Sequence, residues 1–196
     1  TSSYLLPTLQ SALVTTNPSL EFFKTAEARR AFMQFLDRET LIPQVLGDRS
    51  ELATSNYAKG MIPDGLDTQD ITYDPSVLTK YAATLDPGTK LVLGYATGNP
   101  NAQAIAEIVA AQLQAIGLSA TAQGYPTSQV FGWANDPTKG PDAFIDGNNG
   151  PDGGSPYLWG HVFWDKTGGI NYFLCDDPEV DSLLNQAVRT VTTPST

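Results

Sequence analysis

Cysteine and histidine are almost absent from this chain of 196 residues, in which Cys175 and His161 are the only examples. A lone cysteine cannot form an internal disulfide, and thiolate metal sites require several such side chains. His161 is not part of a His-Glu-x-x-His helix, so we predict a hydrogen-bonded histidine in a loop rather than a zinc ligand. We therefore expect neither a metal site nor a cofactor.

Basic residues are also scarce. The chain has 11 Lys and Arg residues against 21 Asp and Glu residues, which gives a formal net charge of −10. Nucleic acids and anionic membranes are bound by basic surfaces, so neither is expected as a partner. The sequence contains no apolar run long enough to span a membrane and no signal peptide. Because it begins with Thr1 rather than Met, we expect it to be part of a longer polypeptide.

Several motifs of enzymes and cation sites are missing. The chain has no G-x-S-x-G elbow and no P-loop, and Gly-Asn-Asn-Gly at 147–150 is not a dinucleotide fingerprint. A calcium loop starting at Asp146 fails because Pro151 occupies the position of the obligatory glycine and Tyr157 that of the bidentate glutamate. These observations favour a binding protein over an enzyme.

The composition is that of an ordered α/β protein. Hydrophobic residues make up 41% of the chain and charged residues 16%. Residues 90–125 form the clearest unit: apolar residues alternate from Leu91 to Tyr95, a helical apolar pattern follows Asn99, and alternation resumes after Gly117. This pattern predicts a β-α-β unit, in which two parallel strands are joined by a right-handed crossover.

Other segments predict further helices and strands. We expect one short strand at most in residues 1–24 and a short strand at 143–145. Helices are expected at 26–36 after an N-terminal cap by Thr25, from Arg38 to about Leu46, at 75–84, at 126–136 with Val130, Phe131 and Trp133 buried, and from Asp177 onward with an apolar stripe of Val180, Leu183, Leu184, Ala187 and Val188.

Residues 142–160 contain the best candidate for a site. The predicted strand runs into a loop of Gly, Asn, Pro and Asp with aromatic residues beside it. Such a loop offers backbone donors and carboxylates next to apolar surface, which suits a small polar ligand, particularly one with a cationic amine. We expect most aromatic residues of the chain to be core, and Tyr157 and Trp159 to form the wall of a pocket.

The carboxylates of the same segment leave an enzyme alternative open. Asp142, Asp146 and Asp152 allow a secreted hydrolase that uses paired carboxylates for acid–base chemistry. Aspartate in a Gly-rich loop is equally typical of turns, because the side chain bonds its own backbone there. The sequence offers no partner that would decide between these roles.

Four segments, in order, resemble motifs of one family. Residues 28–39 (ARRAFMQFLDRE) match its helix-pair pattern R-x-A-x-A-I/L-D-R-E/K, and 91–95 with 105–118 match its strand and following helix. Residues 150–152 (GPD) match its W-G-P-D loop, and 169–184 match its ending N-y-x…d-P-e-v-D-x-L-l. Over nearly its whole length the chain thus resembles the solute-binding proteins of ABC importers, in the family that includes dipeptide- and oligopeptide-binding proteins.

This resemblance implies an architecture and a set of partners. It implies a periplasmic-binding-protein-like lobe (type II, cluster C) with a mixed sheet and flanking helices, residues 1–196 being a single lobe of a two-lobed receptor that closes on its ligand. The implied partners are a peptide or similar small polar solute, the first lobe of the same protein and an ABC permease. The implied location is extracytoplasmic, either periplasmic or as a cell-surface lipoprotein.

The resemblance also implies which residues bind. In peptide-binding relatives the aspartate of this loop holds the ligand's ammonium group, and Asp152 matches it. Amide and backbone contacts are then expected from Asn148, Asn149, Gly150 and Gly153. The sequence departs from the family nearby, because Asn149 replaces the usual Trp and Asp146 stands where relatives often have a basic residue. The local field is therefore more negative, which favours cationic or polyhydroxylated ligands.

Overall fold

The computed structural model describes residues 11–47, 50–53, 55, 57, 61, 71–149, 155–174 and 176–190. The strands of this part are β1 (Ser11–Thr16), β2 (Lys90–Ala96), β3 (Ser119–Tyr125) and β4 (Ala143–Asn149). Its helices are α1 (Ala26–Phe35), α2 (Arg38–Leu41), α3 (Pro75–Ala82), α4 (Pro100–Ala115), α5 (Thr127–Val130), α6 (Pro156–Trp164) and α7 (Pro178–Thr190), and shorter helical segments are η1 (Glu21–Phe23), η2 (Ile42–Leu46), η4 (Phe131–Asn135) and η5 (Pro137–Lys139).

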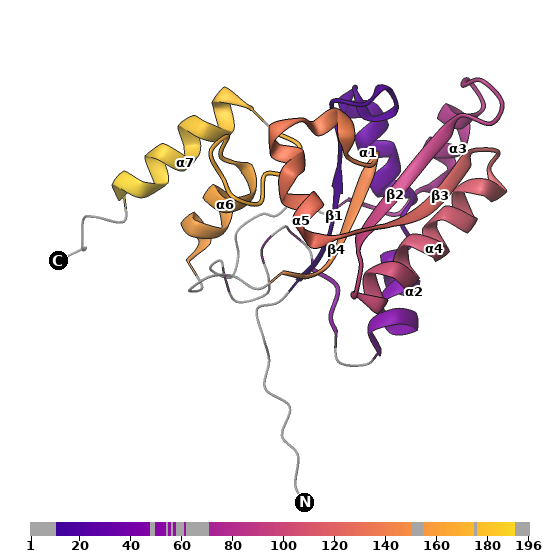
Figure 1. The fold of residues 1–196 in the computed structure, drawn as a ribbon, viewed down its shortest axis with the longest axis horizontal. Helices are drawn as coiled ribbons and strands as arrows, with labels where there is room; N and C mark the ends of the chain where they lie inside the picture. The colour runs from indigo at the N-terminus through magenta and orange to yellow at the C-terminus, as the bar shows by residue number, and fades with distance from the viewer. Residues whose placement is uncertain are drawn as a thin grey trace, which may run out of the picture.

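The four strands form one mixed sheet in the order β1-β4-β2-β3 (Figure 1). β2 pairs in parallel with β3 on one side and with β4 on the other, whereas β1 runs antiparallel to β4. The predicted β-α-β unit at 90–125 is confirmed as β2-α4-β3, and the predicted short strand at 143–145 continues to Asn149. The fold is thus the predicted α/β class, a mixed sheet with flanking helices.

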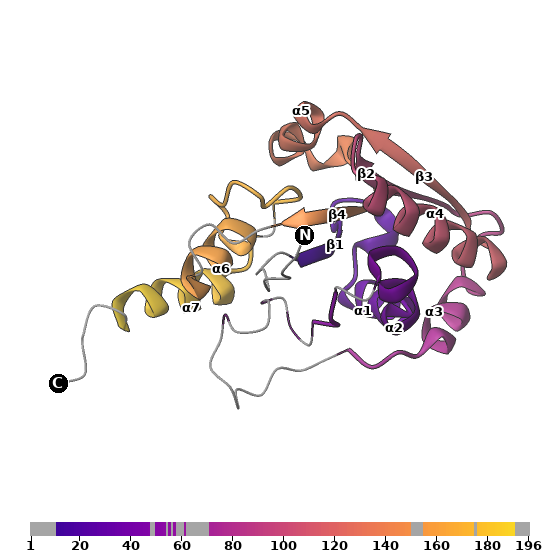
Figure 2. The same cartoon turned by 90° about the horizontal axis from the view of Figure 1, so that it is seen from below.

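The larger hydrophobic core lies on one face of the sheet. α4 begins where Asn99 accepts a hydrogen bond from the Ala102 N–H at 3.0 Å, and it ends before Gly117, whose φ of +95° suits glycine. Its buried side packs on β2, β3 and β4. α1 and α3 pack against each other in the same layer, and Figure 2 shows α1–α4 gathered below the sheet. Apolar residues from all these elements form the core cluster.

The helix predicted from Arg38 to Leu46 changes character within its length. α2 covers only the first four residues and continues as the π-helical turn η2, which contains Pro43. A proline lacks the N–H that an α-helix needs at this point, so the wider turn is the physical consequence. Gly47, at φ +71°, ends the segment as predicted.

A second, aromatic cluster covers the opposite face. The helix predicted at 126–136 is instead α5, four residues long, followed by the 3-10 helix η4. Val130 and Trp133 are buried as predicted, but the prediction that Phe131 is buried is wrong, because its side chain is 54% exposed. The tighter 3-10 turn rotates Phe131 away from the sheet. Trp133 instead packs among Tyr125, Phe144 and Phe173.

A buried asparagine directly after β1 contacts segments that are distant in the sequence. Asn17, which directly follows β1, is 0% exposed. Its Nδ2 donates to the carbonyl oxygens of Pro137 at 2.8 Å and Pro141 at 3.1 Å, and its N–H donates to the Asp142 carbonyl at 2.8 Å. The side chain therefore fixes the chain leaving β1 to the segment that enters β4.

α6 and α7 lie side by side at one end of the molecule, away from α1–α4, in both views (Figures 1 and 2). Val180, Leu184 and Ala187 of the predicted apolar stripe are half-buried, whereas Leu183 and Val188 are exposed. The stripe is therefore wider than the contact with α6. None of the helices in the described ranges is long and apolar enough to cross a membrane.

Candidate ligand site at the carboxyl ends of β2 and β4

The strand order creates a topological switch point between β2 and β4. From β2 the chain crosses to β3 on one side through α4, and it then returns to β4 on the other side of β2. The carboxyl ends of the parallel strands β2, β3 and β4 lie at one edge, and the direction of the connections reverses between β2 and β4. In open α/β sheets, ligands bind in the crevice outside the carboxyl ends of the strands at such a switch point.

The described residues form an open hollow at this point. It has a volume of about 350 Å³ and is lined by Gly98, Asn99, Pro100, Asn101 and Gly147. Gly98 and Asn99 lie in the turn from β2 into α4, Pro100 and Asn101 begin α4, and Gly147 belongs to β4. A Cβ on Gly147 would lie only 2.7 Å from the Asn99 Nδ2, so the close approach of β4 to the start of α4 requires glycine.

The predicted ligand loop starts from this edge. Asn148 and Asn149 complete β4, so their backbone continues from Gly147 at the hollow. Gly150, Asp152 and Gly153 lie outside the described residues. The roles of these five residues stay predictions.

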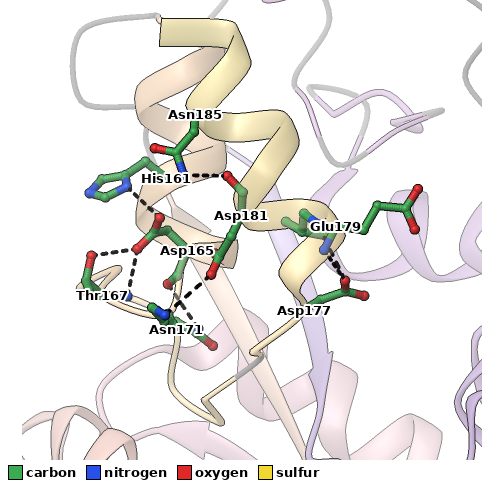
Figure 3. A network of polar contacts seen from close by, with 10 residues as sticks. His161, Asp165, Thr167, Asn171, Asp177, Glu179, Asp181 and Asn185 are labelled. Atoms are coloured by element: carbon green, nitrogen blue, oxygen red, sulfur yellow. Dashed lines mark hydrogen bonds and ion pairs between the residues drawn. The ribbon is translucent and has the colours of Figure 1, made fainter.

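Tyr157 and His161 stack on successive turns of α6. Their rings are 5.9 Å apart with an interplanar angle of 15°. His161 Nδ1 lies 3.5 Å from Asp165 Oδ2, an ion-pair distance when the imidazole is protonated (Figure 3). The prediction that His161 lies in a loop is wrong, because Ser155 caps a helix that includes it. Tyr157 is half-buried.

Polar contacts hold the end of α6 and the start of α7 (Figure 3). The Oγ1 and N–H of Thr167 donate to Asp165 Oδ1 at 2.6 and 2.8 Å, and these bonds, with the charge of His161, lower the pKa of Asp165. Asn171 Nδ2 donates to the Asp165 carbonyl, and Lys166 Nζ lies 4.0 Å from Asp181 Oδ2 of α7. This network fixes the helix that carries Tyr157.

Trp159 is on the inner side of α6. Its side chain is 3% exposed and clusters with Met61, and its ring lies 4.5 Å from that of Phe163. Leu13 of β1 packs against the same cluster. Trp159 therefore anchors α6 to the neighbouring segments, and any effect on a ligand would act through the position of that helix.

Two of the three candidate catalytic carboxylates lie at different heights along β4. Asp142 directly precedes the strand and Asp146 is its middle residue, so a rise of four residues of extended chain separates them by roughly 13 Å. Carboxylate pairs of glycosidases lie about 5–9.5 Å apart. Asp142 Oδ2 instead accepts the Val92 N–H at 2.8 Å, which ties the start of β4 to β2. The third carboxylate, Asp152, lies outside the described residues.

Asp142 gives a testable pH dependence. Burial raises the pKa of its carboxyl, opposed by the bond from the Val92 N–H. The pKa of Asp142 in the folded state is thus above its unfolded value of about 3.9. Its protonated form makes its full contribution to stability below about pH 3.9, and this contribution is lost as the pH rises through the folded-state pKa. Asp142→Asn keeps an acceptor for Val92 but removes the charge. We expect the variant to gain stability relative to wild type between pH 3 and 7, measured by urea unfolding; an equal difference at both pH values would contradict this.

Among the residues that the structure describes, no group of three or more His, Cys, Asp or Glu side chains is placed to hold a metal ion.

Two residues of the hollow were missed by the sequence analysis. Gly98 and Asn99 were not predicted as site residues, because the sequence shows them only as a helix start. The available signal was their position directly after the first strand of the β-α-β unit, where parallel strands place ligand contacts.

Comparison with known proteins identifies the family of this chain. The profile of bacterial extracellular solute-binding proteins, family 5 (middle region), matches residues 3–170. No curated protein matches the chain in a sequence search. The chain combines a mixed sheet flanked by helices with a hollow at the switch point of that sheet. It belongs to the bacterial extracellular solute-binding proteins of family 5.

Solved structures share the fold. The oligopeptide-binding protein AppA from Bacillus subtilis, in complex with a nonapeptide, is 23% identical with a TM-score of 0.73, over 92% of this chain and 39% of AppA. NikA from Staphylococcus aureus, in complex with Ni(L-His)2, is 18% identical with a TM-score of 0.76, over 91% and 38%. DppA from Helicobacter pylori, in complex with the peptide STSA, is 14% identical with a TM-score of 0.77, over 93% and 36%. The chain thus spans about two fifths of the length of these proteins.

Proposed function

We propose that this chain is the ligand-binding lobe of an extracytoplasmic receptor that delivers a peptide or similar small polar solute to an ABC permease. Residues 1–196 would form one lobe, and the ligand would bind between it and the first lobe of the same protein. The observation that carries the proposal is the hollow at the switch point between β2 and β4, which Gly147 of β4 lines. Family membership supports it.

The ligand contacts proposed on this lobe follow the carboxyl edge. Asp152 would hold a cationic group of the ligand by a charge-assisted hydrogen bond, which strengthens when closure removes water. Asn148, Asn149, Gly150 and Gly153 would supply amide and backbone groups. Tyr157 would add apolar surface, and Trp159 would support it from within. An open lobe buries only one side of a ligand, so tight binding requires both lobes.

We expect Asp152→Ala in the full-length protein to weaken ligand binding at least about tenfold, because the ligand's charge loses its partner in a desolvated site. Small molecules that co-purify with the protein are identified by mass spectrometry, and their affinities are then measured by calorimetry. Asp86→Ala is the matched control, because Asp86 lies in the turn before the amino end of β2, far from the site. Unchanged affinity in Asp152→Ala would overturn the assignment of Asp152.

The proposed protein is a binding component without catalytic activity. Family 5 is a family of binding proteins, and the separation of Asp142 from Asp146 argues against the alternative of a hydrolase that pairs them. We propose a periplasmic or cell-surface lipoprotein location for the protein that contains this chain. Hydrolysis of a bound peptide by the full-length protein, lost in Asp152→Asn, would favour the hydrolase instead.

A further inference from the structure

Asp146 is a half-buried carboxylate in the middle of β4, one residue after Ile145, which pairs with Tyr95 near the carboxyl end of β2. Because side chains alternate along a strand, it shares a face with Phe144 of the aromatic cluster, while Gly147 faces Asn99. The Tyr172 hydroxyl donates to Asp146 Oδ2 at 3.2 Å. Tyr172 itself is buried, and its ring packs on that of Phe144 at 5.5 Å. The hydrogen bond from the packed Tyr172 side chain therefore fixes the position of the Asp146 carboxylate.

The hydrogen bond from Tyr172 leaves most of the carboxylate's bonding capacity open. Burial, together with the charge of Asp146, raises the pKa of Tyr172, so its hydroxyl keeps its proton and remains a donor. An ionised carboxylate accepts about four hydrogen bonds. Within the described ranges of the chain, no Lys or Arg lies at ion-pair distance from Asp146. A cation supplied from outside the lobe would complete this site.

Phe131 supplies the second half of such a site. It follows the carboxyl end of β3, and thus lies at the same edge of the sheet as Asp146. Its ring packs edge-on against Tyr172 at 6.1 Å and leaves more than half of its surface exposed. Phe131 and Asp146 both contact Tyr172, so an exposed aromatic ring and a carboxylate without a cationic partner share one support. A carboxylate beside an aromatic face is a recognised arrangement for binding ammonium and guanidinium groups.

We propose that Asp146, held by Tyr172 and accompanied by the exposed ring of Phe131, is a specificity-determining contact that selects ligands with a cationic side group over anionic ones. This inference rests on the proposed function and adds the charge class of the ligand to it. The net charge of −10 acts in the same direction, because it attracts cationic ligands at long range. The local contact, unlike the overall charge, depends on one residue.

The experiment compares two tripeptides, Ala-Lys-Ala and Ala-Glu-Ala, by calorimetry with the full-length protein. We expect wild type to bind the lysine peptide at least about tenfold more tightly, and Asp146→Asn to lower this preference to about threefold or less, because the amide still accepts from Tyr172 but carries no charge. Asp86→Asn makes the same charge change in the exposed turn before the amino end of β2, and should keep the preference. Asp146→Ser serves if Asp146→Asn fails to fold.

The outcomes separate the possible roles of Asp146. A purely structural role would weaken the binding of both peptides alike or lower the unfolding temperature, with the preference unchanged; that result overturns this inference and leaves the proposed function standing. Equal loss of preference in Asp86→Asn would assign the selectivity to overall charge and would also overturn it. If wild type binds neither peptide, peptide binding as the proposed function fails, and the inference fails with it.

Discussion

Trp133→Ala is expected to destabilise this chain by about 3–5 kcal/mol, the usual cost of removing a large buried aromatic side chain. Trp133 is 1% exposed, and three rings surround it: Tyr125 at 5.0 Å, Phe144 at 5.2 Å and Phe173 at 5.8 Å. They belong to β3, β4 and the segment after α6. Removing the indole therefore leaves a cavity where three parts of the chain meet. Urea unfolding followed by far-UV circular dichroism measures the loss.

Phe131→Ala is the matched control for Trp133→Ala. It lies two residues earlier in the same 3-10 helix, and its ring is mostly exposed. We expect its loss to be below about 1 kcal/mol, since little apolar area leaves water there on folding. The Trp133 Nε1–H has no hydrogen-bond partner among the described residues, so Trp133→Phe should lose less than Trp133→Ala. Similar losses in the alanine variants of Phe131 and Trp133 would contradict the assignment of Trp133 to the core.

Asn17→Ala is expected to cost about 2–4 kcal/mol, more than a typical polar substitution, because it removes several hydrogen bonds of a fully buried side chain. The Pro141 carbonyl oxygen loses the Asn17 donor, the Pro137 carbonyl oxygen keeps only the Gly140 N–H at 3.0 Å, and the Ser19 N–H loses the Asn17 Oδ1 at 3.1 Å. Water does not replace these bonds at a fully buried position without opening the structure. The same unfolding measurement applies.

Asn135→Ala provides the comparison for Asn17→Ala. Asn135 is exposed, and it lies in η4, close in sequence to the Asn17 partners. Its substitution should change the free energy of unfolding by no more than about 0.5 kcal/mol. The Asn17 prediction fails if the two variants unfold at the same urea concentration.

The fold could be predicted where its determinants are local. The β2-α4-β3 unit could be predicted from 36 consecutive residues, because the alternation of apolar and polar residues, the Asn-Pro helix start and the glycine that ends the helix all lie within this segment. The burial of Phe131 was wrongly predicted as part of one continuous helix at 126–136, whereas this segment turns into a 3-10 helix after four residues. The sequence Asn17-Pro18-Ser19 resembles an ordinary turn, and nothing local indicates partners 120 and 124 residues away.

The site could be predicted only in part, for the same reason. The Gly- and Asn-rich segment at 147–153 is visible in the sequence, and its Gly-Pro-Asp motif is one of the four segments that resemble the family. The hollow is not visible, because it arises where Gly98 and Asn99 meet Gly147, and glycine there acts only through the absence of a side chain. The support of Asp146 by Tyr172 is likewise a contact between residues 26 positions apart. Tertiary packing, rather than residue type, creates both features.

The antiparallel pairing of β1 with β4 has a consequence for how the chain is made. Thr16 pairs with Ala143, which the ribosome adds 127 residues later. At a synthesis rate of about 5–20 residues per second, roughly 6–25 s separate the two strands. During that interval β2, α4 and β3 emerge together and can associate, while β1 waits beside them as an unpaired strand. β1 therefore stays without its β4 partner until most of this chain has been synthesised.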